Sequence, residues 1–470
     1  MIASLRWVGA LVGTTWRDVS PRAGIRRSPL VMLTALIASL PAVALIVGLP
    51  TRPLVALPLY ARQTGQPCAA CHTAFPELTP FGRRFKLGGY TMGGGDSSLP
   101  IAVMLQPTFT RTEVGQPGGA APHFGPNNNF AMQEVSLFTG GRITDNIGAF
   151  VQGTYSGIDR RFAVDNTDIR FAHSAKVEGH DLLWGLTLHN NPTVQDVWNT
   201  TPVWRFPFIS SDLAPAPAAS TFIEGAFSQR VVGLGSYALI DDLLYLELSG
   251  YRTLSKHTQL ALGTDPSEGS AIDGVAPYWR IALEPNFGKH SLQVGAFGMH
   301  SDVVPLRMRG AGTDSFTDFG LDSQYQYIDD VHTFTLRSAL IQEDRNLRAS
   351  EVLGLADNTR NNLQSLRISA SYIYDSTWSI TGERFKISGS PDATLYGTAN
   401  GSPNSSGWTA ELAYLPFMRG GPSFWPWLNA RVGLQYTFYD KFNGASTNFD
   451  GNGRNAHNNN TLFLYTWLMF

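Results

Sequence analysis

The amino-acid sequence predicts an all-β fold, a transmembrane antiparallel β-barrel of about 16 strands with a short N-terminal plug segment. Three observations lead to this prediction: the composition, an alternation of apolar and polar residues, and a regular order of short turns and long loops. Charged residues make up 15% of the 470 residues, below the share of about a quarter that is usual in soluble proteins. Glycine (47 residues) and aromatic residues (11%) are abundant. The chain is therefore rich in turn formers and poor in charge.

The composition also excludes several classes of protein. A bundle of membrane helices needs repeated apolar runs of about 20 residues, and the long region after residue 100 has none. The formal net charge of −2 gives no electrostatic reason to expect nucleic acid as a partner. The two cysteines are separated by only two residues, so they cannot form a disulfide scaffold.

The N-terminus predicts a signal peptide over residues 1–56. An apolar stretch over residues 30–49 follows a basic segment that contains Arg6, Arg17, Arg22, Arg26 and Arg27. This order is typical of secretory export, here through the Sec pathway, and the alternative is an uncleaved inner-membrane anchor, because the apolar stretch is long. Either alternative takes the rest of the chain out of the cytoplasm.

Both cysteines lie in one motif, Cys68-Ala69-Ala70-Cys71-His72. This is the C-x-x-C-H signal for covalent attachment of c-type haem: two thiols bond to one porphyrin, and the adjacent imidazole is the proximal ligand of the iron. A zinc site would need a second ligand pair, and a thioredoxin-like pair would need a βαβ pattern; the sequence offers neither. We therefore expect one haem c in a cytochrome segment over residues 57–100, with His72 as a metal ligand.

The second axial ligand of the iron is predicted less specifically. Met92 lies 20 residues after His72, in a glycine-rich segment where the backbone could approach the porphyrin. A Met ligand would raise the redox potential of the haem, whereas the alternative is that Met92 only fills a gap beside it. Met104, His123 and an open position remain as further alternatives. For the haem propionates, Arg83, Arg84 and Lys86 are either binding partners or a solvated charge run.

The region from residue 101 to residue 470 carries the barrel pattern. Residues 244–249 read Leu-Tyr-Leu-Glu-Leu-Ser and residues 279–284 read Trp-Arg-Ile-Ala-Leu-Glu. Such segments of about ten residues, with alternating lipid-facing and lumen-facing side chains, are typical of outer-membrane barrels. A soluble sandwich would show the same alternation, so the connections between the segments have to distinguish the two folds.

Short and long connections alternate along this region, as in bacterial barrels. We expect eight long loops, near 114–128, 157–163, 190–221, 253–275, 301–316, 344–361, 388–406 and 440–457. We expect seven short turns, near Asp145, Glu178–Asp181, Asp241, Asn286–Lys289, Asp329, Asp375 and Arg419–Pro422. These 15 connections separate 16 strands. The last strand ends in a C-terminal Phe470, like the assembly signal of outer-membrane proteins, and its other face carries Phe463, Tyr465 and Trp467, which could pack against something inside the lumen.

The haem segment is too short to enclose a haem by itself. Only 28 residues separate His72 from Ile101, so we expect the barrel to supply the remaining wall, with the haem plug inside the lumen or at its periplasmic side. The predicted lumen face carries acids and bases of the kind that form porin constrictions. They are Glu134, Arg142, Asp168, Arg170, Glu247, Arg280, Glu284, Asp322, Arg337, Arg367, Glu411 and Arg431.

The segment from Ala61 to His72, followed by Phe75–Arg83 and Phe85–Tyr90, resembles the fused cytochrome–porin family of outer-membrane iron oxidases. The resemblance is specific over about thirty residues and otherwise one of architecture. It implies that Cys68, Cys71 and His72 bind the haem. It also implies that electrons pass from extracellular Fe(II), or another donor, to a periplasmic carrier such as a cytochrome or a copper protein, which would make the chain a possible Fe(II) oxidase.

Three functions follow as hypotheses. The first is electron transfer at the outer membrane, with membrane lipid, an electron donor and a periplasmic carrier as partners. The second is a diffusion porin in which the haem is structural or gates the pore. The third is a haem-based sensor, which would need an open sixth position on the iron.

Overall fold

The structure is a computed structural model that describes residues 59–93, 100–201, 208–225, 227, 229–265, 269–421 and 428–470. The predicted signal peptide, residues 1–56, lies outside the described residues. So do parts of the predicted cytochrome segment, residues 57–58 and 94–99.

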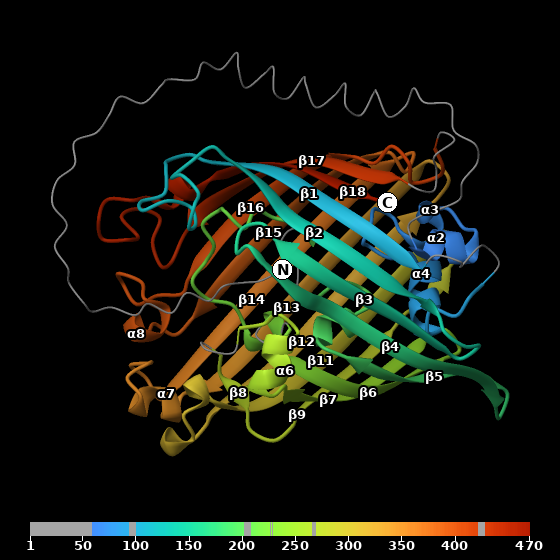
Figure 1. The fold of residues 1–470 in the computed structure, drawn as a ribbon, viewed down its shortest axis with the longest axis horizontal. Coiled ribbons are helices and arrows are strands. Elements are labelled where there is room, and N and C mark those ends of the chain that lie inside the picture. The colour runs from blue at the N-terminus through green and yellow to red at the C-terminus, as the bar shows by residue number, and fades with distance from the viewer. Residues whose placement is uncertain are drawn as a thin grey trace, which may run out of the picture.

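Sixteen antiparallel strands form a closed barrel, as predicted (Figure 1). Each strand pairs with its neighbours in chain order, and β1 pairs with both β2 and β18, which closes the sheet. The strands are β1 (Ile101–Thr112), β2 (Asn129–Arg142), β3 (Ile147–Ser156), β4 (Arg161–Val177), β5 (His180–His189), β6 (Val231–Ile240), β7 (Leu244–Thr253), β9 (Ala276–Leu283), β11 (His290–Val304), β12 (Asp314–Ile328), β13 (His332–Asn346), β14 (Arg360–Tyr374), β15 (Trp378–Gly389), β16 (Ser405–Tyr414), β17 (Asn429–Lys441) and β18 (Thr461–Met469). Two two-residue segments, β8 (Ala271–Ile272) and β10 (Asn286–Phe287), extend the sheet beside β11.

The alternation along the strands separates an outer apolar face from a polar lumen face. On β7, Leu246 and Leu248 are exposed on the outside of the barrel, whereas Tyr245 and Glu247 are buried inside. On β9 the apolar Ile281 is likewise exposed. Large apolar side chains on the outside of a closed barrel are the arrangement that a lipid bilayer requires. The structure is therefore that of a transmembrane β-barrel.

The connections follow the predicted alternation of short turns and long loops with two exceptions. The β3–β4 connection, predicted as a long loop, spans only residues 157–160, and the β16–β17 connection, predicted as a short turn, spans residues 415–428, part of which lies outside the described residues. In the β6–β7 turn, Asp241 and Asp242 both have φ of 52°. Positive φ at both central residues defines the type I′ turn, whose twist matches that of paired strands and which Asp and Asn tolerate. The short turns all lie at one end of the barrel. In bacterial outer-membrane barrels this end faces the periplasm.

Short helices lie in the N-terminal segment and in the loops. They are α2 (Leu59–Thr64), α3 (Cys68–Cys71), α4 (Pro80–Leu87), α5 (Pro192–Gln195), α6 (Lys256–Ala261), α7 (Arg348–Val352) and α8 (Ala393–Tyr396), with the 3₁₀ turns η2 (Phe222–Glu224), η3 (Pro305–Arg307), η4 (Arg309–Ala311) and η5 (Ala456–Asn459). Within the described ranges, none of these helices is long and apolar enough to cross a membrane.

The N-terminal segment, residues 59–93, closes the short-turn end of the barrel, and we call it the plug. Figure 1 shows α2, α3 and α4 (blue) at the end opposite α7 and α8. The backbone N–H of Ala69 donates to the carbonyl of Met418 in the β16–β17 turn (2.8 Å), and the hydroxyl of Tyr60 donates to the carbonyl of Ala149 on β3 (2.9 Å). These contacts attach the plug to the barrel on both sides of the β1–β18 pairing that closes it.

The loop between β5 and β6 folds into the lumen, and we call it the inward loop. Val197, Trp198, Ile209, Leu213 and Ile223 are each only 1% exposed. The side chains of three lumen-facing residues donate to carbonyl groups of this loop, from β17 (Gln435 to Ile209, 2.8 Å), β2 (Gln133 to Ser210, 2.9 Å) and β13 (Arg345 to Ser220, 2.9 Å). Because these strands stand on different sides of the barrel, the inward loop crosses the lumen.

The inner face of the last strand packs inside the lumen, as its aromatic residues predicted. Phe463, Tyr465 and Trp467 are at most 3% exposed. The ring of Trp467 meets that of Phe75 from the plug edge to face, with 5.4 Å between centroids. The plug therefore shares a hydrophobic cluster with β18.

The predicted lumen face is confirmed except at Arg142. Arg142 is exposed and pairs with Asp145 in the β2–β3 turn. The cause is local, because Gly141 has φ of 112°, which interrupts the extended backbone and reverses the direction of the next side chain.

Candidate cofactor site

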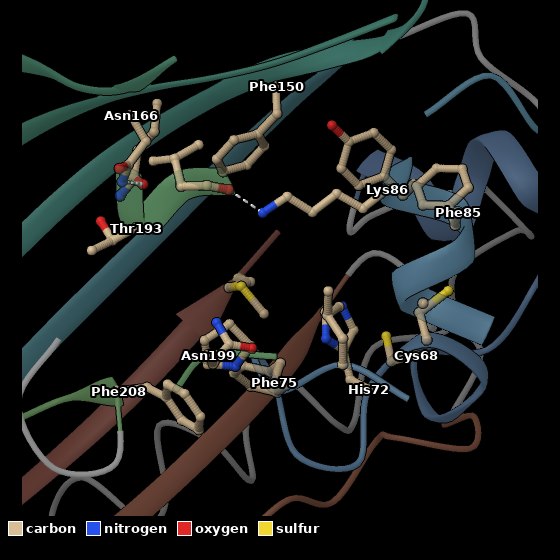
Figure 2. A pocket seen from close by; sticks show the side chains of 18 of the residues that line it. Cys68, His72, Phe75, Phe85, Lys86, Phe150, Asn166, Thr193, Asn199 and Phe208 are labelled. Carbon is tan, nitrogen blue, oxygen red and sulfur yellow. Dashed lines mark hydrogen bonds between the residues drawn. The ribbon is translucent and has the colours of Figure 1, made fainter. Parts of the chain in front are cut away.

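A cavity of about 320 Å³ lies between the plug and the wall of the barrel. Its volume falls within the range of about 300 to 1,000 Å³ that is usual for ligand sites. Cys68, Cys71 and His72 all line it, and Figure 2 shows Cys68 and His72 on the plug side. The structure thus brings three of the four predicted site residues to one cavity.

The local fold explains how the motif presents its side chains. Pro67 precedes α3, a single helical turn that places Cys68 and Cys71 on one face. His72 then leaves the helix with an extended backbone, while its N–H donates to the carbonyl of Cys68 (2.8 Å). Thr79 fixes the turn from the other side, since its N–H donates to the carbonyl of Cys71 (2.9 Å).

Helix α4 packs directly on this turn. Thr79 caps the helix, with its hydroxyl accepting from the N–H of Gly82 (3.1 Å), and Pro80 occupies the first turn, where a missing N–H costs nothing. A Cβ at Gly82 would lie 2.1 Å from the carbonyl oxygen of Cys71. Only glycine allows this approach, so α4 is held in a fixed position relative to the two cysteines.

The donor groups have the chemistry that haem attachment needs. Both cysteines are free thiols, and burial raises the pKa of Cys68 to about 11. Asn429 donates to the sulfur of Cys68 (3.1 Å). Burial also lowers the pKa of His72 to about 4, so its imidazole is neutral at physiological pH. Neutral imidazole is the form that binds a metal ion.

Eight aromatic side chains contribute to the remaining cavity wall, and half of them come from outside the plug. The plug contributes Tyr60, Phe75, Phe85 and Tyr90, and other elements contribute Phe138, Phe150, Phe208 and Trp467. Tyr60 stacks on Tyr90 with 5.3 Å between ring centroids. The barrel therefore supplies part of the wall of the cavity that the motif lines.

Two arginines from the barrel add positive charge to this apolar cavity. Arg337 of β13 pairs with Glu77 of the plug (2.8 Å), and Arg367 of β14 pairs with Glu383 (2.8 Å). The Nε atom of each arginine is buried and has no hydrogen-bond partner among the described residues. An apolar cavity with two thiols, a neutral imidazole and guanidinium groups fits the attachment, ligation and propionate groups of a haem c.

The structure places Met92 away from this cavity. Its side chain is 40% exposed and does not line the cavity, and its carbonyl accepts from Gln63 (2.8 Å). Met104 is buried in the cluster beside β18, and His123 is exposed in the β1–β2 loop. None of the three is in position to be a second axial ligand. The described residues also contain no group of three or more His, Cys, Asp and Glu side chains that could hold a metal ion.

Of the three basic residues considered for the propionates, only Lys86 lines the cavity. Arg83 instead joins the plug to the barrel wall. Its guanidinium donates to Glu284 (2.6 Å), Gln324 (3.1 Å) and Gln326 (2.8 Å). Arg84 pairs with Asp242 in the β6–β7 turn, where both side chains are largely exposed.

Replacing Arg83 with methionine should loosen the plug. Glu284 would remain buried without its charged partner, a loss of about 3–5 kcal/mol, whereas Arg84→Met removes a solvent-screened pair worth at most about 1 kcal/mol. Limited proteolysis of the folded barrel should therefore cleave the plug of R83M faster than that of the wild type or R84M. Equal cleavage of R83M and R84M would show that the buried ion pair does not hold the plug.

The fold and the site together define a transmembrane β-barrel with a plugged lumen and a C-x-x-C-H motif in an internal cavity. No protein-family model matches the chain, and no curated protein matches it. Solved structures that resemble it are outer-membrane barrels. Salmonella typhi OmpF in complex with daunomycin is 12% identical over 79% of this chain and 97% of its own, with a TM-score of 0.46. The anion-selective porin from Comamonas acidovorans is 10% identical over 78% and 98%, with a TM-score of 0.43.

OmpT of Vibrio cholerae, folded in vitro, is a further similar structure, 8% identical over 79% of this chain and 96% of its own, with a TM-score of 0.42. Likenesses this distant carry no argument about function. The assignment of the fold rests on the strand pairing and on the outward apolar residues.

Proposed function

We propose that this protein is an outer-membrane cytochrome–porin with one covalently bound haem c, which transfers electrons from extracellular Fe(II) to a periplasmic carrier, a cytochrome or a copper protein. One observation carries the proposal: the C-x-x-C-H motif faces a cavity inside the barrel whose wall is largely apolar. For each Fe(II) oxidised to Fe(III), the carrier accepts one electron. The family resemblance of the plug supports iron as the donor.

The residues of the cavity have distinct roles in this proposal. Cys68 and Cys71 would hold a haem c through two thioether bonds, and His72 would bind its iron. Arg337 and Arg367, which line the cavity, would pair with the propionates. The largely apolar wall disfavours water in the cavity. When bound, a c-type haem supplies one-electron chemistry between the ferric and ferrous states.

The position of the site is consistent with a periplasmic acceptor. The plug lies at the short-turn end, beside the turns that carry Asp242 and Met418. A carrier that docks there approaches the cavity from the periplasm. The donor approaches from the opposite end, where the long loops are. Iron thus stays outside the periplasm, and insoluble ferric product does not collect there.

A diffusion porin with a structural, gating or sensory haem is the second candidate, and the closed barrel of 16 strands favours it, because barrels of this size enclose an aqueous lumen. The filling of the lumen argues against it. The plug occupies one end, and the inward loop crosses the interior with five residues that are 1% exposed.

The visible absorption spectrum of the purified, oxidised protein tests the proposal. Addition of Fe(II), at acidic and at neutral pH, should promptly produce the sharp bands of ferrous haem c, and dithionite gives the reference for full reduction. Reduction by dithionite alone would reject iron as the donor. A protein without covalently bound haem would overturn the whole proposal.

A further inference from the structure

Lys86 differs from the other cations inside the barrel. Buried arginines on the described strands pair with carboxylates, for example Arg170 with Asp168 (2.8 Å) and Arg431 with Glu411 (2.5 Å). The amino group of Lys86 forms no ion pair with any described residue, and it donates only to the carbonyl of Val194 in the inward loop. Lys86 is half-buried, and Asp168, Asp196 and Glu247 favour its charged form without pairing with it directly. Its amine is therefore available to a ligand in the cavity that it lines.

The position of Lys86 is fixed relative to the haem-attachment motif. Lys86 lies one helical turn after Gly82, so both are on the same face of α4. Gly82 packs against the carbonyl of Cys71. Figure 2 shows the Lys86 side chain reaching across the cavity on the side of Phe150, while His72 and Phe75 lie on the other side. The amine and the imidazole thus face the same space from different sides.

We propose that the Lys86 amino nitrogen is the second axial ligand of the haem iron, opposite His72. This inference rests on the proposed function, because it requires the haem. Coordination uses the lone pair of the neutral amine, so the ammonium group gives one proton to solvent as the N–Fe bond forms; Lys86 is only half-buried. The amine keeps two N–H groups, and one of them can continue to donate to the Val194 carbonyl.

Two other assignments compete with this one. Met469 also lines the cavity, but it packs against the hydrophobic cluster that contains Phe75 and Trp467, and these contacts account for its position. Lys86 could instead pair with a propionate as a cation. In that case arginine would replace it, since a guanidinium keeps the charge but has no lone pair for iron.

The test uses the ferric spectra of the wild type, K86R, K86A and M469L, all purified from outer membranes. Haem content is measured first, by staining of the denatured protein. Electron paramagnetic resonance should then show low-spin iron in the wild type and in M469L, and high-spin iron in K86R and K86A. Near-infrared magnetic circular dichroism of the wild type should show amine ligation, which makes the test independent of how well the variants fold.

The outcomes separate the two proposals. A wild-type protein without covalent haem overturns the proposed function. Haem-loaded protein in which K86R stays low-spin, or M469L becomes high-spin, overturns the assignment of Lys86 and leaves the haem site intact. High-spin wild-type iron overturns it as well, because the second axial position would then be open.

Discussion

Replacing both Cys68 and Cys71 with serine should abolish covalent haem attachment. Serine keeps the size of each side chain, but its hydroxyl cannot form the thioether bonds that tie the porphyrin to the plug. Peroxidase staining of the denatured protein should fall from full intensity to background. Each single substitution should leave at most one bond to the porphyrin and an intermediate loss of staining.

The matched control for this prediction is Ala70→Ser, which introduces the same hydroxyl between the two cysteines and should keep full staining. Heat-dependent migration on gels shows whether each variant has assembled its barrel. Haem that stays covalently bound to an assembled double variant would contradict the role of the two thiols.

Removing the plug and the inward loop together should convert a blocked barrel into a conducting one. We expect deletion of residues 59–93 combined with replacement of residues 197–224 by a short Gly-Ser linker to raise single-channel conductance at least about tenfold, because a barrel of 16 strands without internal side-chain packing encloses an aqueous channel. Planar lipid bilayers give the measurement. In the wild type, Trp198 donates to Glu284 (2.6 Å) and Arg280 lies over its ring (4.8 Å), so the loop is held firmly inside.

Shortening the β11–β12 loop at residues 307–311 is the control, because this loop includes the exposed Met308 and lies at the barrel rim. The conductance of this shortened variant should equal that of the wild type. If the wild type already conducts as well as the combined deletion, the lumen is open and the diffusion-porin hypothesis is favoured.

The barrel could be predicted because its determinants are local in the sequence. The alternation of Leu246 and Leu248 with Glu247 assigns each side chain to one face, and the Asp241-Asp242 pair marks a turn by its own backbone preference. The motif from Cys68 to His72 is equally local, since its spacing alone specifies a chemistry. Each of these signals fits within about ten residues, which a strand or a turn spans.

The rest of the site depends on contacts that no local pattern contains. Arg337 and Phe208 reach the cavity from parts of the chain far from the plug, and only the closure of the barrel brings them there. Met92 was a reasonable candidate by spacing, but the turn after α4 directs it outward. The sequence alone left Lys86 either as a partner of a haem propionate or as part of a solvated charge run. Lys86 lies on the same face of α4 as Gly82, and only the close packing of Gly82 against Cys71 places that face toward the cavity of the motif.

The shared walls of the cavity also impose an order on biogenesis. In the folded barrel Cys68 is 6% exposed. The cavity beside it is bounded by the first strands of the chain, by the last strand and by the inward loop. An attachment enzyme cannot reach a thiol in this position. The haem of the proposed function therefore has to be attached while the chain is still unfolded in the periplasm, and the barrel then closes around a plug that already carries its cofactor.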